Sequence, residues 1–144
     1  KRANLGGWYE EVYYSLLQIA LLKIELNAPL DEVQNLLLAA YEYRPQRAES
    51  LYHLARQLRY HNKARLAYIY ATVAANIPLS KDILFVDHAV YEWKAKEELA
   101  MSANSVGNYQ LCHDLCVELL FNPAVPEPNR KLLLDNLKLA KEHL

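Results

Sequence analysis

The amino-acid sequence predicts an all-α protein built from helical hairpins. Glycine occurs 3 times and proline 6 times in 144 residues, whereas alanine and leucine are abundant. Apolar residues recur three and four positions apart in one segment after another, and no alternating β pattern is sustained. Two hairpin-length segments also align with each other without a gap. Together these observations favour antiparallel helices stacked side by side.

Each expected helix fills the interval between two helix-breaking strings. The breakers are GG at 6–7, NAPL at 27–30, RPQ at 44–46, HNK at 61–63, NIPLS at 76–80, VGN at 106–108 and NPAVPEP at 122–128. The expected helices cover 8–26, 30–42, 47–60, 63–76, 88–105, 108–121 and 127–142. The segment 79–90 fits three interpretations: a loop, a short strand-like piece, or an early start of the fifth helix.

The segments 48–78 and 93–123 are two copies of one helix-turn-helix unit. The alignment pairs Leu54 with Leu99, Ala55 with Ala100, Asn62 with Gly107, Ala67 with Cys112, Ala71 with Cys116 and Pro78 with Pro123. The first hairpin is a looser copy, in which Val33 precedes Ala67 by 34 residues. The step from Ala67 to Cys112 is 45, which is 34 plus an insertion of 11 around SKDILFV.

This pattern resembles the tetratricopeptide repeat, a helix-turn-helix unit with small residues where neighbouring helices approach closely. The resemblance implies a right-handed α-α superhelix of three hairpins (8–42, 47–76 and 88–121) in a single domain over 1–144. The helix 127–142 would cap the last hairpin, because open arrays need a polar outer face. No such helix precedes the first hairpin. We therefore expect an exposed apolar face there, in a piece of a longer protein.

Four strings narrow the resemblance: GGWYEEVYYSLLQIA (6–20), AYEYRPQRAESLYHLAR (40–56), DILFVDHAVYEWKAKEELA (82–100) and GNYQLCHDLCVELL (107–120). In this order they are similar to the helical region attached to family 2 glycosyltransferase-like proteins. That resemblance implies a non-catalytic module accessory to a transferase. The chain has no Asp-x-Asp string, which such enzymes use to bind a metal and a nucleotide-sugar diphosphate. We therefore expect no enzyme activity and no cofactor.

Composition and charge argue against several other classes. A net charge of −1 provides no basic face for nucleic acid. The longest apolar run, LLLAAY at 36–41, is far shorter than the roughly 20 residues that span a bilayer. Two cysteines do not make a disulfide framework, so a reducing, cytoplasmic location is expected.

Both cysteines lie in the string CHDLC at 112–116. Cys112 and Cys116 share one face of a helix, whereas His113 points about 100° away. A zinc ion would need two more ligands, and the remaining histidines (His53, His61, His88 and His143) form no ligand pair. Because both cysteines align with alanines, we interpret them as small buried residues, with His113 at the surface and no metal site.

The first helix of each hairpin in such arrays lines a concave groove. The core side of the helix 47–60 is expected to hold Leu51, Leu54, Ala55 and Leu58, which leaves a polar face. That face and its equivalent in the next hairpin present nine candidate binding residues: Glu49, Tyr52, His53, Arg56, Arg59, Lys94, Glu97, Met101 and Asn104. Such side chains suit a peptide carboxylate or an acidic segment. The alternative is that the charged ones pair with neighbours on a solvated face.

Other notable residues have simpler interpretations. Arg44 and Arg47 flank a turn, where they would cap carbonyl groups at the end of the helix 30–42. The tyrosine doublets, such as YY at 13–14, are expected to pack between hairpins rather than to stack on a ligand.

The sequence therefore predicts a protein-protein interaction or scaffold module. Its partner would be a protein or peptide in the groove, or a neighbouring domain of the same protein, with no nucleic acid and no membrane span. Two alternatives remain open: the groove holds the acceptor in a sugar-transfer reaction, or the module is a structural spacer.

Overall fold

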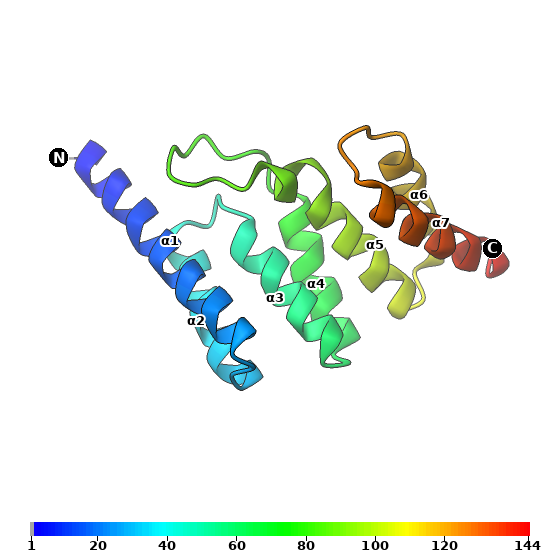
Figure 1. Ribbon diagram of the computed structural model, residues 1–144, viewed down its shortest axis with the longest axis horizontal. Coiled ribbons are helices and arrows are strands. Elements are labelled where there is room, and N and C mark those ends of the chain that lie inside the picture. The colour runs from blue at the N-terminus through cyan, green and yellow to red at the C-terminus, as the bar shows by residue number, and fades with distance from the viewer. Residues whose placement is uncertain (1) are drawn as a thin grey trace.

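The computed structural model describes residues 2–144, and their side chains from Gly6 onward, as a row of packed helices (Figure 1). The helices are α1 (Arg2–Glu25), α2 (Leu30–Tyr43), α3 (Glu49–Tyr60), α4 (Ala64–Ala75), α5 (Ala95–Ser105), α6 (Tyr109–Leu120) and α7 (Glu127–Glu142). A π-helical turn, η1 (Val90–Lys94), leads into α5. The described residues contain no strand, so the predicted all-α class is confirmed.

Helix α1 begins earlier than the sequence predicts. The expectation that Gly6 and Gly7 precede this helix is wrong, because α1 runs through both. Glycine costs a helix about 1 kcal/mol relative to alanine, but it does not forbid one. A Cβ atom at either glycine would meet no other heavy atom within 4 Å, so packing inside the chain does not require glycine there.

Consecutive helices pack against one another along the whole row. Helix α3 also contacts α5, and α5 contacts α7, so these three helices share one side of the molecule (Figure 1). Helix α1 forms one end of the row and α7 lies at the other. One apolar cluster extends from α1 through α2, α3 and α4 to Val90 and Ala95, and a second extends from Trp93 through α5 and α6 to α7.

The first helix of each hairpin ends in the same left-handed cap. Asn27, Asn62 and Gly107 have φ angles of 56°, 62° and 87°, which asparagine and glycine tolerate best. In each case the following N–H returns to a carbonyl five residues earlier: Ala28 to Lys23 (2.9 Å), Lys63 to Leu58 (2.9 Å) and Asn108 to Ala103 (2.8 Å). The shared geometry at Asn62 and Gly107 agrees with the predicted alignment of the two hairpins.

The small residues of the alignment lie where the helices meet. Ala55, Ala67 and Ala71 in the second hairpin and their counterparts Ala100, Cys112 and Cys116 in the third are all 0% exposed. A larger side chain at these positions would force the helices apart. The interpretation of these positions as packing sites is therefore confirmed.

The two cysteines are free, buried thiols. Their sulfur atoms lie 4.0 Å apart among side chains of α6 and α7. Burial raises the pKa of the Cys116 thiol to about 12 and raises that of Cys112 as well, so both stay protonated. Within residues 2–144, no group of three His, Cys, Asp or Glu side chains is placed to hold a metal ion.

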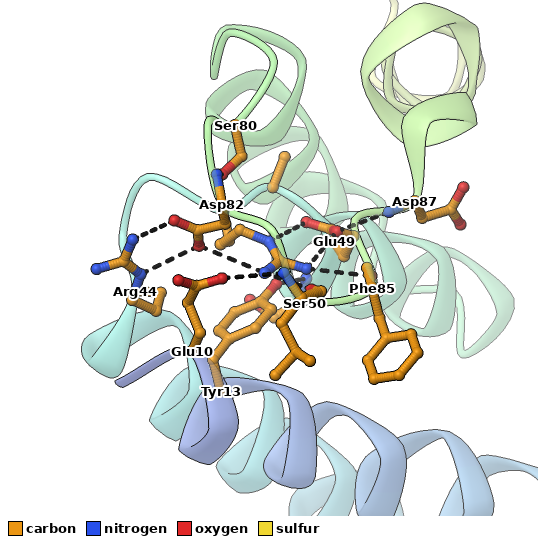
Figure 2. Close-up of polar contacts among 12 residues, drawn as sticks. Glu10, Tyr13, Arg44, Glu49, Ser50, Ser80, Asp82, Phe85 and Asp87 are labelled. Atoms are coloured by element: carbon orange, nitrogen blue, oxygen red, sulfur yellow. Dashed lines mark hydrogen bonds and ion pairs between the residues drawn. The ribbon is translucent and has the colours of Figure 1, made fainter. Parts of the chain in front are cut away.

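The insertion in the repeat forms the connection between α4 and η1. Residues 76–87 contain no helix, and helical structure resumes at His88, so the loop interpretation is correct for 79–87. Figure 2 shows this connection beside Glu10 and Tyr13 of α1 and Glu49 at the start of α3. We call residues 76–87 the crossing loop.

A fully buried arginine, Arg47, binds the crossing loop through its guanidinium group. Its guanidinium donates to both oxygens of Glu49, at 2.8 and 3.2 Å, and to Asp82 at 3.4 Å. It also donates to the carbonyls of Leu84 at 3.3 Å and Phe85 at 3.4 Å. These bonds satisfy the donors that burial would otherwise leave unpaired.

Carboxylates accept hydrogen bonds from backbone N–H groups of the same loop. Glu10 on α1 accepts hydrogen bonds from the N–H groups of Ile83 and Leu84, both at 3.0 Å. Glu49 accepts from the N–H of Asp87 at 3.1 Å. The loop is therefore held through its backbone from two separate segments of the chain, α1 and the start of α3.

The expectation that Arg44 and Arg47 cap the end of α2 holds only for the Arg44 backbone, whose N–H bonds to the Ala40 carbonyl at 3.2 Å, because neither arginine side chain caps the helix. Arg44 forms an ion pair with Asp82 instead, and Arg47 reaches the same carboxylate. Asp82 lies in the crossing loop, 38 positions beyond Arg44, so the pairing depends on tertiary structure rather than on the local turn.

No helix in residues 2–144 is both long enough and apolar enough to cross a lipid bilayer.

Candidate functional site

A pocket of about 470 Å³ opens between α3, the η1–α5 segment and α7. We call it the groove. Six of the nine residues predicted as binding residues line it: Tyr52, Arg56, Arg59, Lys94, Glu97 and Met101. Tyr60, Trp93, Glu98, Asn129 and Leu132 complete the lining.

An ion pair joins two walls of the groove. Arg59 on α3 donates to both oxygens of Glu98 on α5, with distances of 2.6 and 3.0 Å. Burial works against the charged form of Arg59, but its bonds to Glu98 outweigh that effect and raise its pKa. The charge of Arg59 is therefore neutralised inside the protein.

Arg56 also lines the groove, but no carboxylate neutralises it within the described residues. Its Nε donates to the Tyr60 hydroxyl at 2.9 Å, and its guanidinium carbon lies 5.4 Å from the centre of that ring. Among the residues that the structure describes, Arg56 makes no salt bridge. Lys94 adds a second positive charge, with its Nζ at 4.0 Å from the Asp87 carboxylate and 5.9 Å from the Trp93 ring centre.

Aromatic, apolar and amide side chains form the rest of the lining, together with the carboxylate of Glu97. Tyr52 is 6% exposed and Trp93 is 8% exposed, so they form a nearly closed floor. Burial raises the pKa of Tyr52 to about 12, which keeps its hydroxyl neutral. Burial also raises the pKa of Glu97, although the Asn129 amide donates to its carboxylate at 2.8 Å. The groove therefore combines two buried aromatic side chains with an accessible guanidinium.

Three predicted binding residues do not line the groove. Glu49 is 1% exposed and binds Arg47, Tyr91 and the crossing loop. Burial opposes its ionisation, but the bonds from Arg47 and Tyr91 prevail and lower its pKa. The prediction that Glu49 faces the groove is wrong, because helical periodicity does not reveal the buried arginine two residues before it.

His53 and Asn104 also make contacts with other side chains instead of lining the groove. The His53 ring packs edge-on against Tyr52 at 4.9 Å, and burial, followed by the charge of Arg56, lowers its pKa to about 4. Asn104 donates to the Asn136 side chain of α7 at 3.5 Å. Neither residue is among those that line the groove.

Sequence reasoning misses the contribution of α7. Asn129 and Leu132 are one helical turn apart on a helix that is predicted only to cap the last hairpin, yet both line the groove. Trp93 is missed because the π-helical turn at Val90–Lys94 changes the periodicity just before α5. No local signal in the sequence marks either feature.

Comparisons with protein-family models, curated proteins and solved structures find no match. The function is therefore argued from the geometry of the groove.

Proposed function

We propose that this chain is a non-catalytic interaction module of tetratricopeptide type, and that its groove binds a protein segment bearing a carboxylate. The proposal rests mainly on the environment of Arg56. This arginine is exposed, it makes no salt bridge within the described residues, and it stands at the edge of an aromatic floor. The neighbouring Arg59 cannot serve in the same way, because Glu98 already occupies it.

The chemistry of the lining suits such a ligand. A guanidinium and a carboxylate form charge-assisted hydrogen bonds that are about twice as strong as neutral ones. Trp93, Met101 and Leu132 offer apolar surface beside this charge. A volume of about 470 Å³ has room for one or two side chains of a peptide, within the usual range of ligand pockets.

The right-handed superhelix belongs to the same proposal. The repeated left-handed caps, the buried small residues at aligned positions and the shared side of α3, α5 and α7 support it. In such an array the first helices of successive hairpins provide a continuous binding surface, and the groove lies on these helices.

The similarity of four strings to the helical region of family 2 glycosyltransferase-like proteins supports a link to such an enzyme. In that setting the ligand of the groove is a segment of the attached transferase domain or of its acceptor protein. Two free cysteines suit a reducing cytoplasm.

A selection experiment tests the proposal. The module is used to select binders from a random peptide library displayed on phage. Met101→Arg, which fills the groove, serves as the counter-screen, and Leu66→Arg on the exposed side of α4 is the matched control. We expect peptides rich in Asp or Glu and in apolar residues, bound by the wild type and the Leu66 variant but not by the Met101 variant. If no peptide distinguishes the Met101 variant from the wild type, the groove is not a peptide-binding site.

A further inference from the structure

The face of α1 that points away from the core carries an apolar stripe that one polar residue, Ser15, interrupts. We call it the α1 seam: Trp8, Val12, Ser15, Ile19, Leu22 and Leu26, with alternating spacings of four and three. Leu26 follows the last residue of α1, but its N–H still bonds to the carbonyl of Leu22 at 3.0 Å, so the spacing persists. The core face of the same helix, with Tyr13, Leu17 and Ala20, is at most 4% exposed.

The apolar side chains of the α1 seam are unusually exposed to solvent. Trp8, Ile19, Leu22 and Leu26 are 48%, 45%, 55% and 70% exposed. Helix α1 ends the row, and no described helix lies beyond it (Figure 1). An exposed apolar patch of this kind marks an interaction surface.

The spacing specifies the kind of partner. Alternating steps of three and four keep a stripe aligned with a second helix that packs along it, as in a coiled coil. From Trp8 to Leu26 the seam is about 27 Å long at 1.5 Å per residue, which accommodates nearly three heptads of a partner helix.

The charges beside the seam specify the partner further. One edge carries Glu11 and Glu25, both exposed and without a salt bridge among the described residues, with the neutral Gln18 between them. On the other edge Lys23 already pairs with Glu32 of α2 at 3.7 Å. The free charge beside the seam is therefore negative.

We propose that the α1 seam binds an amphipathic helix of another polypeptide, whose apolar stripe is flanked by lysine or arginine. A second copy of this chain is a poor antiparallel partner. Pairing Trp8 of one copy with Leu26 of the other would bring Glu11 of each copy close to Glu25 of the other, and like charges repel.

The acidic edge continues into a hollow that favours the same partner. Glu10, Glu11 and Gly7 on α1 and Ile83, Leu84 and Phe85 in the crossing loop line a pocket of about 320 Å³. Ile83 is 94% exposed, although its N–H is bound by Glu10. A basic side chain of the partner helix can enter this pocket beside Glu11.

Tryptophan fluorescence tests the proposal, because Trp8 lies in the seam and the only other tryptophan is Trp93. The whole chain carrying Trp93→Phe is titrated with a synthetic three-heptad helix that has leucine along its stripe and lysine on both edges. A second peptide with glutamate in place of lysine is the control. We expect a saturable blue shift with the lysine peptide and at least about tenfold weaker binding of the glutamate peptide.

Variants of the chain complete the experiment. Ile19→Asp with Leu22→Asp should abolish the blue shift, whereas Leu66→Asp with Ile69→Asp on α4 should leave it unchanged, with folding checked by circular dichroism. Equal binding of the two peptides, or binding that survives the seam substitutions, overturns the proposal. The proposal is also overturned if sedimentation shows that the wild-type chain is a dimer and that the seam substitutions, but not the α4 substitutions, dissociate it. The seam would then bind a second copy of this chain.

Discussion

Arg59 and Glu98, 39 positions apart in the sequence, form a two-point ion pair that joins α3 to α5 inside the groove. Glu98 is nearly inaccessible, with a side-chain exposure of 4%, whereas Arg59 retains 24%. The pair thus has a structural role, and it leaves Arg56 as the arginine of the groove without a salt bridge among the described residues. Arg56 and Arg59, one turn apart on α3, therefore differ in their contacts: Arg59 is held in an ion pair, and Arg56 is not.

Removing Arg59 should cost far more stability than removing Arg56. Arg59→Ala leaves the buried carboxylate of Glu98 without its partner, which we expect to lower the free energy of unfolding by about 2–4 kcal/mol. Arg56→Ala loses one exposed hydrogen bond to Tyr60 and should change it by about 0.5 kcal/mol or less. Urea denaturation measures both values, and equal losses for the two variants would contradict the assignment.

The crossing loop should loosen when Asp82 is replaced. Asp82→Ala removes an acceptor that Arg44 and Arg47 share, so amide hydrogen exchange across 79–87 should become faster while exchange in α5 and α6 stays unchanged. Lys81→Ala, one residue earlier and without a salt bridge within the described residues, is the control. Unchanged exchange in the Asp82 variant would show that this ion pairing does not hold the loop.

His53 should make the protein less stable in mild acid. Its pKa lies at about 4 in the folded protein and near 6.5 in the unfolded chain. Between these values the unfolded chain binds the extra proton, so stability is lost as the pH falls from 6.5 towards 4, on the order of 2 kcal/mol in total. His53→Gln should flatten unfolding curves over this range, whereas His61→Gln at the exposed end of α3 should not.

The loss of stability caused by protonation of Glu49 should begin at a lower pH than the loss caused by His53. Its pKa is lowered in the folded protein, so its contribution is full above the unfolded pKa of about 4.5 and fades as the pH falls below that value. A loss of stability in the His53→Gln variant that begins only below about pH 4.5 would agree with both assignments.

The cysteines should behave as packing residues. Cys112→Ala with Cys116→Ala should cost about 1–2 kcal/mol or less, whereas Leu119→Ala on the same buried face should cost about 2–5 kcal/mol. Both thiols should react with a thiol reagent only after unfolding, because they are buried and protonated. Fast reaction of the native protein would contradict this.

Much of the fold is predictable because its signals are local. Asparagine, glycine and proline mark the helix ends, and the alignment of Ala67 with Cys112 correctly predicts that a cysteine is buried. The error at Gly6 and Gly7 has the same origin, because a local rule that treats two glycines as a breaker neglects the helix continuing on both sides.

The site is predictable only in part because its contacts are distant in sequence. Periodicity correctly places Arg56 and Met101 on one surface, since each lies on an amphipathic helix. It cannot reveal that Arg47 pairs with Asp82, 35 positions away, and it therefore assigns Glu49 to the wrong surface. The contribution of Asn129 from α7 depends on how that helix packs, which no local pattern specifies.

A double-mutant cycle tests the central claim, that Arg56 in the groove binds a carboxylate, most directly. The Kd of a peptide selected by the wild-type module is measured by calorimetry for the wild type and Arg56→Ala, each with the acidic peptide and with its amide analogue. Arg65→Ala on α4 is the control arginine. The account predicts a coupling energy of about 1–3 kcal/mol for Arg56 and none for Arg65. Equal Kd values for the wild type and Arg56→Ala would contradict it.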